Sequence, residues 1–455
     1  MAERYQTLKR AYSGYHRNQA GPNLELAQVG PDTPGGEYLR RFWHPIELSS
    51  SVQDRPVALR VLGEDLVLFR DLSGNLGLLD KHCPHRGASL EFGKITECGI
   101  QCCYHGWHFA CDGTLLETPV HPDARYAGRL FHAAYPVRET AGLIFAYMGP
   151  PDRTPDFPHF DFFDDDVEGR ILYKRPSPCN WIQTRDNEVD NDHGYFLHTV
   201  MAGIQLTTAH QELAKINLFE THSGLITTQS RRVGKNIFVR INAMILPNLS
   251  RIACIEDGQG NMVFDRRGPI VHWSVPVDDE NCFVIGWNTV AANLPDKKLN
   301  AYMDRERAAG HDLYTHPQLN FTFGQDGERS YAERQRIPGD WDAWVSQGPI
   351  HIHALEHLVP GDGAIVRYRG MLRDGIRAVA AGEDPKGLVS RVTRPLETYA
   401  SNTAIPVPQA STLADDAALI DEVERELVAR TLDGTYRDGY RHPRQEQESS
   451  VETDR

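Results

Sequence analysis

The spacing of hydrophobic and polar positions divides the chain into two regions with different predicted secondary structure. Between residues 37 and 150, short apolar runs such as VALRVLGEDLVLFRD and AGLIFAYMG are separated by Gly, Asp and Pro. This pattern predicts short antiparallel strands in a small sandwich or barrel, so the first region is expected to be all-β. Residues 1–36 predict an irregular N-terminal extension, and residues 151–168, rich in Pro and Asp, predict a linker.

The region after the linker combines strand and helix patterns. Residues 169–432 are expected to form an α+β domain in which helices flank an antiparallel sheet, and residues 433–455 read as a polar tail. Four apolar runs predict strands of this sheet: 236–246, 251–257, 270–277 and 281–290.

Helices are expected at both ends of the same region. NWIQTRDNEVDNDHGYFLH, residues 180–198, predicts mostly helix, and residues 298–310 and 363–377 also look helical. The C-terminal helix has an apolar stripe with a spacing of four, formed by Leu419, Val423 and Leu427.

Composition and charge exclude several classes of protein. The 455 residues are 40% hydrophobic and 24% charged, which excludes wholesale disorder, and the net charge of −14 argues against nucleic-acid or anionic-membrane partners. No apolar run approaches the roughly 18 residues of a membrane span, and the polar N-terminus has no secretory signal. A cytoplasmic protein is therefore expected, in which cysteines are more often metal ligands or core residues than disulfides.

Five of the eight cysteines lie in one short stretch that also contains two paired Cys–His turns. Cys83 and His85 form the first turn, and Cys102 and His105 form the second. Two cysteines and two histidines can close a tetrahedral zinc site, or they can hold a two-iron, two-sulfide cluster with thiolates on one iron and imidazoles on the other. The spacing alone does not decide between these metals.

The sequence around these turns resembles the two cluster-binding loops of Rieske iron–sulfur domains. The similar stretches are CPHRGA at 83–88 and YHGW at 104–107. The resemblance implies an all-β Rieske domain over residues 37–150. Its [2Fe–2S] ligands would be Cys83, His85, Cys102 and His105.

A second group of candidate ligands follows the linker as Asp-X2-His-X4-His. Asp190 and His193 share one helix face, but His193 and His198 would lie about 140° apart on an ideal helix. For both rings to reach one metal, the helix must bulge or break between them, and Gly194 is the obvious place.

This segment resembles the catalytic motif of Rieske non-heme iron oxygenases, and NWIQ at 180–183 resembles their phthalate dioxygenase-like branch. The resemblance implies that His193 and His198 bind a mononuclear iron, Fe(II), in a catalytic domain. It also implies that Asp190 bridges to a Rieske ligand histidine and carries electrons between the two centres.

A third iron ligand is needed, because such oxygenases bind iron by two histidines and one carboxylate. GDWDAWVSQGPI, residues 339–350, resembles a branch segment whose ligand Asp lies eight residues before Gly-Pro-Ile, which assigns the role to Asp340. Asp342 is the near rival and Glu356 a more distant one. The nearby histidines His351, His353 and His357 are expected to be polar helix or pocket residues.

The resemblance implies the oxygenase component of a multicomponent enzyme. A separate flavin and iron–sulfur reductase would take electrons from NADH, and O2 would oxidise a small, aromatic substrate by monohydroxylation, dihydroxylation or demethylation. Homotrimers are common in the family, and the electron path would run from His105 of one protomer to Asp190 and His193 of the next. The competing hypothesis is a Rieske electron carrier or a structural zinc protein without catalysis, but neither needs the long second region.

Overall fold

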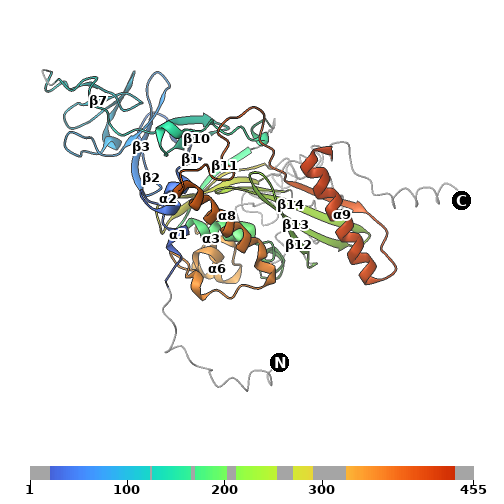
Figure 1. Cartoon of the computed structure of the whole chain (residues 1–455). Helices are drawn as coiled ribbons and strands as arrows, with labels where there is room; N and C mark the ends of the chain where they lie inside the picture. The colour runs from blue at the N-terminus through green and yellow to red at the C-terminus, as the bar shows by residue number, and fades with distance from the viewer. Residues whose placement is uncertain are drawn as a thin grey trace, which may run out of the picture.

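The computed structural model describes six stretches of the chain: residues 21–122, 125–164, 170–201, 212–253, 270–289 and 324–435. A lobe of small sheets lies at one end of the molecule, around β7, and α9 (Leu413–Asp433) lies at the other end (Figure 1). A large sheet with its helices lies between them (Figure 1). The predicted order, an all-β region followed by an α+β region, is therefore observed.

The first lobe consists of three antiparallel sheets, as expected from its short apolar runs. The first sheet has the order β1-β10-β9, the second β2-β3-β4 and the third β5-β6-β7-β8. The strands are β1 (Trp43–Leu48), β2 (Val57–Val61), β3 (Glu64–Arg70), β4 (Leu76–Asp80), β5 (Lys94–Thr96), β6 (Gly99–Gln101), β7 (His108–Phe109), β8 (Leu115–Glu117), β9 (Val137–Thr140) and β10 (Leu143–Tyr147). A small separate core that includes Phe69, Ile100 and Phe109 supports the two Cys–His turns.

The N-terminal extension is more regular than the sequence suggests. It forms two short helices, α1 (Leu24–Ala27) and α2 (Pro34–Leu39), where an irregular segment is expected. The side chains of Asn180 and Trp181 donate hydrogen bonds to the carbonyl oxygens of Ala27 (2.8 Å) and Leu26 (3.1 Å). The extension therefore anchors the start of helix α3 (Trp181–Val189).

The second lobe is built on one antiparallel sheet of eight strands. Its order is β11-β17-β16-β15-β14-β13-β12, and β18 pairs with the part of β14 that β15 leaves uncovered. The strands are β11 (Arg170–Ser177), β12 (Lys215–Glu220), β13 (Gly224–Val233), β14 (Asn236–Ile245), β15 (Leu249–Ile252), β16 (Ile270–Pro276), β17 (Cys282–Thr289) and β18 (Ser401–Pro406).

Strands β14, β16 and β17 match three of the predicted apolar runs, whereas β11, β12, β13 and β18 are additional. Strand β15 overlaps the start of the run predicted at 251–257, and residues 254–257 of that run lie outside the described stretches. The helices around the sheet include α3, α6 (Tyr331–Arg336), α7 (Asp340–Val345), α8 (Gly363–Ala380) and α9. The helix expected over 298–310 lies outside the described residues, as does most of the tail at 433–455.

The segment predicted as a linker packs into the core. Phe160 and Phe162 are buried, and the Phe162 ring lies 5.6 Å from the Trp287 ring of β17. Phe145 of β10 lies 5.5 Å from Trp273 of β16 on the same side of the sheet. The Pro- and Asp-rich stretch thus joins the two lobes through aromatic contacts, which bury a large apolar area.

The opposite face of the sheet is polar although it is buried. Tyr173, His272, Ser250 and Met244 lie in one register row across β11, β16, β15 and β14, with Gly286 of β17 between the first two. Helix α3 covers this face at β16. Buried polar side chains need compensating hydrogen-bond partners, so ligands and catalytic groups are expected on this face.

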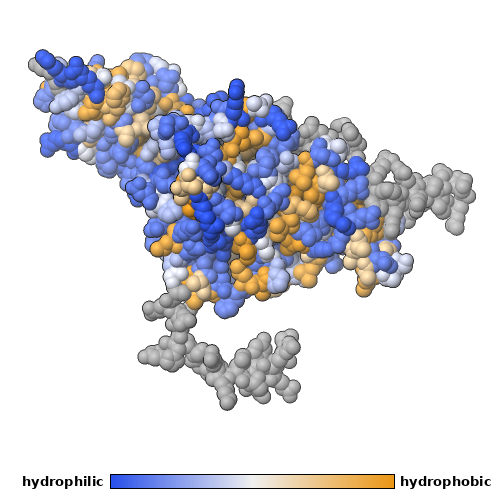
Figure 2. Space-filling model, in the orientation of Figure 1, coloured by the Kyte–Doolittle hydropathy of each residue, from blue (hydrophilic) through white to orange (hydrophobic). Residues whose placement is uncertain are grey.

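The molecular surface carries no large continuous apolar area in the view of Figure 2, where hydrophilic side chains surround separate apolar patches. None of the helices in the described stretches is long and apolar enough to cross a bilayer.

Candidate metal centres

The two Cys–His turns fold into nearly equivalent loops. Four residues after each cysteine stands a glycine with positive φ, Gly87 at 75° and Gly106 at 73°, a conformation that favours glycine. Their backbone N–H groups donate to the carbonyl oxygens of Cys83 (2.8 Å) and Cys102 (3.0 Å). The repeated turn gives both loops a similar backbone path, although the histidine stands two residues after Cys83 and three residues after Cys102.

The two cysteines lie at the buried end of this pair of loops, and the two histidines lie together at the other end. Cys83 and Cys102 are buried, and burial is the largest cause that raises the pKa of the Cys83 thiol, to about 12. At the other end, the rings of His85 and His105 are 4.6 Å apart, and His85 stacks on Trp107. A metal must displace the thiol protons to bind here.

The separation of cysteines from histidines helps to distinguish a zinc ion from a [2Fe–2S] cluster, the two alternatives that the sequence spacing allows. Around one tetrahedral zinc, ligand atoms lie about 3.3–3.8 Å from one another, as follows from Zn–N and Zn–S bond lengths. Among the described residues, no three of Cys83, His85, Cys102 and His105 bring ligand atoms within 4.8 Å of one another. The set fits a [2Fe–2S] cluster, which spans two metal ions, better than a single zinc ion.

The second group of candidate ligands depends on a change of helical winding. Helix α3 ends at Val189, and Asp190 adopts an extended conformation. A short helix α4 (His193–Tyr195) then continues as a π-helical turn over Phe196–Met201. His193 lies in α4 and His198 lies in the π-helical turn, and the wider winding of that turn brings the two rings to one side.

The predicted distortion therefore occurs, but Gly194 is not its position. Gly194 lies inside α4, and the winding changes at Phe196 instead. The segment is mostly helical, as expected, and it is interrupted at Asp190 before His193.

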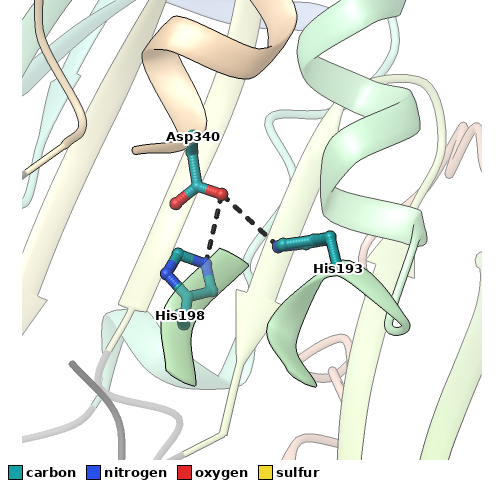
Figure 3. Close-up of side chains that lie close together, drawn as sticks. All are labelled: His193, His198 and Asp340. Carbon is teal, nitrogen blue, oxygen red and sulfur yellow. Dashed lines mark ion pairs between the residues drawn. The ribbon is translucent and has the colours of Figure 1, made fainter. Parts of the chain in front are cut away.

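Asp340 converges on these two histidines from the first turn of α7 (Figure 3). Its Oδ1 lies 3.4 Å from His193 Nε2 and 3.2 Å from His198 Nε2. Ligand atoms of the three side chains all lie within 4.8 Å of one another, and no other such group of three occurs in the described stretches. Two imidazoles and one carboxylate on one side of a site are the ligand set of non-heme Fe(II) oxygenases.

Electrostatics at this group favour a bound cation. Burial alone would raise the pKa of Asp340, but the charges of His198 and His193 hold it well below its usual range. Burial would lower the pKa of His193, but the hydrogen bond to Asp190 and the charge of Asp340 raise it to about 9. A proton on His193 therefore offsets the carboxylate charge, and a metal ion would take its place.

Two neighbouring amides orient the carboxylate of Asp340. Asn187 Nδ2 donates to Oδ1 at 3.3 Å, and Gln325 Nε2 donates to Oδ2. Sequence reasoning noticed no role for Gln325, because nothing in the motif indicates that a residue so far from the histidines reaches this carboxylate.

The rival carboxylates have other partners. Asp342 pairs with Arg329 (2.6 Å) and Arg334 (3.4 Å), and it accepts from the backbone N–H of Gly339 at the start of α7. Glu356 pairs with Arg369 (2.7 Å). Neither carboxylate joins the group formed with the two histidines.

Asp190 contacts the same group from the opposite side. Its Oδ2 lies 3.5 Å from His193 Nδ1, while Oδ1 accepts from the backbone N–H of Asp192 at 2.8 Å. The Asp190 side chain is 30% exposed, so it links the half-buried His193 to the protein surface.

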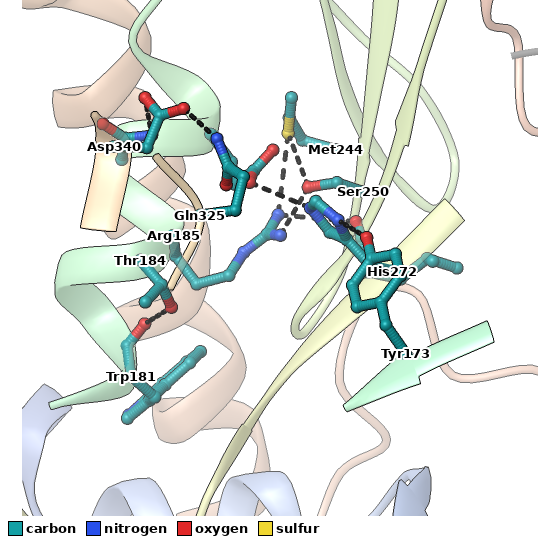
Figure 4. A network of polar contacts seen from close by, with 12 residues as sticks. Tyr173, Trp181, Thr184, Arg185, Met244, Ser250, His272, Gln325 and Asp340 are labelled. Atoms are coloured by element: carbon teal, nitrogen blue, oxygen red, sulfur yellow. Dashed lines mark hydrogen bonds and ion pairs between the residues drawn. The ribbon is translucent and has the colours of Figure 1, made fainter. Parts of the chain in front are cut away.

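A buried polar network adjoins the group (Figure 4). Glu188 of α3 lies 2.9 Å from His272 Nε2, and His272 Nδ1 lies 2.8 Å from Tyr173 Oη. Arg185 is fully buried and donates to Ser250 Oγ and to Tyr368 Oη. No sequence pattern indicates this network, because its members are far apart along the chain.

Comparisons with known proteins agree with this architecture. Residues 42–134 match the family model of the Rieske [2Fe-2S] domain. The chain is 39% identical to the oxygenase subunit of tert-butanol monooxygenase / tert-amyl alcohol desaturase from Aquincola tertiaricarbonis, over 92% of this chain and 91% of the relative. It is 36% identical to phenoxybenzoate dioxygenase subunit alpha from Ectopseudomonas oleovorans, over 83% and 90%.

Two further likenesses extend the comparison. The oxygenase subunit of 5,5'-dehydrodivanillate O-demethylase from Sphingobium sp. (strain NBRC 103272 / SYK-6) is 32% identical, over 90% of each chain. The crystal structure of dicamba monooxygenase bound to dicamba shares the fold, with a TM-score of 0.53 at 18% identity over 75% of this chain and 99% of that chain.

The fold and these relatives define an oxidoreductase with a Rieske domain followed by an α+β domain. The chain belongs to the Rieske non-heme iron oxygenases, in the phthalate dioxygenase-like branch, as the oxygenase subunit of a multicomponent enzyme. The predictions of fold class, family and enzyme class are confirmed, and the alternative of a protein without catalysis is not supported.

Proposed function

We propose that this chain carries two metal centres and uses them to oxidise a small organic substrate with O2. The proposed cluster ligands are Cys83, His85, Cys102 and His105, and the proposed ligands of a mononuclear Fe(II) are His193, His198 and Asp340. The observation that carries the proposal is the convergence of two histidines and one carboxylate in a chain with a Rieske domain.

When bound, the cluster supplies single electrons and the mononuclear iron offers open positions for O2 and substrate. The protein's own side chains set the geometry. Asp340 contributes the charged ligand, and the amides of Asn187 and Gln325 fix its orientation. Asp190 Oδ2 lies 3.5 Å from Nδ1 of His193, which favours a proton on Nδ1 and leaves Nε2 of that ring for the metal.

We also propose a homotrimer in which electrons pass between protomers. The partly exposed carboxylate of Asp190 would accept a hydrogen bond from His105 of a neighbouring protomer and connect it to His193. Two observations support this path: Asp190 already contacts His193, and Tyr104, next to His105, is 56% exposed. Exposed aromatic side chains are frequent at protein interfaces.

The electron donor would be a separate flavin and iron–sulfur reductase that oxidises NADH, and the enzyme would work in the cytoplasm. The relatives are named for oxidation of an alcohol, of phenoxybenzoate and of a methoxylated biaryl. Hydroxylation and demethylation are therefore both within the range proposed for this chain.

The test is O2 consumption by the purified chain with NADH and a surrogate reductase. The substrates would be tert-butanol, tert-amyl alcohol, 3-phenoxybenzoate and 5,5'-dehydrodivanillate, with ¹⁸O2 and mass spectrometry of the products. Substrate-dependent O2 uptake with labelled oxygen in a product is expected, and His198→Ala should abolish it. A chain that reduces cytochrome c at the cluster but never consumes O2 would contradict the proposal.

A further inference from the structure

Glu188 lies beside the proposed iron site but has no part in the proposed function. It follows Asn187 on α3, and its side chain is only 9% exposed. Its charge raises the pKa of His193, and the charge of Asp340 in turn acts on Glu188. The carboxylate therefore shares the low-dielectric surroundings of the metal ligands.

Only one oxygen of this carboxylate has a partner. Oε1 lies 2.9 Å from His272 Nε2, whereas Oε2 is buried and no described residue donates a hydrogen bond to it. An ionised carboxylate accepts several hydrogen bonds, and a buried acceptor left without a donor is costly. A buried oxygen of this kind in a binding region indicates a donor that arrives with a ligand.

The charge of Glu188 is balanced without a further cation. Burial would raise its pKa, but the charge and hydrogen bond of His272 and the charge of Arg185 hold the pKa below its usual value. The guanidinium of Arg185 donates to Ser250, Tyr368 and the carbonyl oxygen of Leu249. Arg185 therefore provides a buried positive charge near Glu188, and Glu188 Oε2 still lacks a hydrogen-bond donor among the described residues.

We propose that Glu188 is a substrate-binding residue whose Oε2 accepts a hydrogen bond from a substrate hydroxyl group. This inference rests on the proposed function and specifies its substrate class. The site takes a neutral alcohol or phenol, because an ether brings no donor and a carboxylate brings a second negative charge next to Glu188. The hydroxyl contact then holds the rest of the substrate beside the histidines.

The guanidinium of Arg175 lies nearby and would favour a substrate carboxylate instead of an alcohol. Arg175 stacks over the Tyr173 ring at 3.9 Å, and its Nη2 is buried without a partner among the described residues. Burial lowers the pKa of Arg175, and the charges of Tyr173 and Asp326 only partly oppose this effect. Binding of a carboxylate at Arg175 is therefore the competing outcome that the test must detect.

The experiment measures anaerobic binding to the iron-loaded chain by calorimetry, with probes that differ in one group. The first set is 3-phenoxybenzyl alcohol, its methyl ether and 3-phenoxybenzoate; the second is tert-amyl alcohol and its methyl ether. In at least one set, the alcohol is expected to bind about tenfold or more tightly than its ether. Glu188→Gln should remove this preference and leave ether binding unchanged.

Several results would overturn the inference. No preference for the alcohol in either set would do so, and so would an alcohol preference that survives in Glu188→Gln with native iron content and thermal midpoint. Tighter binding of 3-phenoxybenzoate that is lost in Arg175→Met would assign the site to carboxylates. A failure of the proposed function is separately visible, because the wild-type chain would then lack mononuclear iron or substrate-dependent O2 uptake.

Discussion

Two aspartates on one helix provide a matched test of the proposed iron ligand. Asp340 and Asp342 are two residues apart in α7, both are largely buried, and both are acidic neighbours of the site. Replacing each by Ala removes the same carboxylate from the same helix. The structure assigns them different partners, so the two variants should fail in different ways.

The expected magnitudes follow from those partners. Loss of a group that merely orients a ligand costs about 10–100-fold in metal affinity, so loss of Asp340 itself should cost at least about 100-fold. Asp342 instead caps α7 through Gly339 and pairs with Arg329 and Arg334. A cap contributes about 1 kcal/mol, and removing one partner of a largely buried ion pair costs about 3 kcal/mol, so Asp342→Ala should lower the free energy of unfolding by about 3–4 kcal/mol.

The assay is iron content after dialysis against a chelator, with the visible absorbance of the cluster recorded separately. Asp340→Ala should keep the cluster and lose the mononuclear iron, whereas Asp342→Ala should keep both and unfold at lower denaturant concentration. The reverse pattern, with iron lost only from Asp342→Ala, would refute the assignment of the third ligand.

Four further predictions use other parts of the molecule. Cys102→Ser should lose the cluster absorbance, whereas Cys103→Ser should keep it, because the Cys103 side chain is exposed. Asp190→Ala should keep both metals and lose turnover, because its link between His193 and the surface is removed; single-turnover product formation by pre-reduced protein measures this. Burial lowers the pKa of His44 to about 4, so the free energy of unfolding should fall by up to about 3 kcal/mol as the pH falls from about 6.5 to 4, and His44→Gln should reduce this fall in denaturant titrations. Glu424→Ala should lower the free energy of unfolding by about 3 kcal/mol, because the Glu424 carboxylate accepts hydrogen bonds from three buried or partly buried side chains of the sheet.

The direction of the pH effect follows from the His44 pKa, and each prediction has a control or a result that would contradict it. His44 is neutral when folded and titrates near its ordinary value when unfolded, so the unfolded chain binds the extra proton between these pKa values and acid favours unfolding. Glu422→Ala, on an exposed position of the same helix as Glu424, should change stability little. Normal product formation by Asp190→Ala, an acid response unchanged by His44→Gln, or equal cluster loss in Cys102→Ser and Cys103→Ser would each contradict the corresponding argument.

The sequence predicts those features of the site that depend on short-range spacing. The two Cys–His turns are local, and a glycine with positive φ closes each of them. The sequence also contains a local signal that distinguishes Asp340 from Asp342. An acidic residue in the third position of a helix caps it, as Asp342 does through Gly339, which leaves Asp340 available for another role.

The sequence does not predict the polar parts of the core. In β13, Thr227, Gln229 and Arg231 alternate on one buried face, and a hydropathy pattern cannot distinguish this from an exposed face. The same limit hid Glu188 and His272, whose contact across 84 positions depends on the register of the sheet. The π-helical turn is also not visible in the sequence, because it differs from an α-helix by only one residue per turn.

The central claim is that one chain holds a two-iron cluster and a separate mononuclear iron. Anomalous diffraction at the iron absorption edge, from crystals of the anaerobically purified chain, tests it directly. The account predicts two adjacent iron positions between the cysteines and histidines of the Rieske loops, and a third position between His193, His198 and Asp340. A single zinc ion in the Rieske loops, or iron bound away from Asp340, would contradict it.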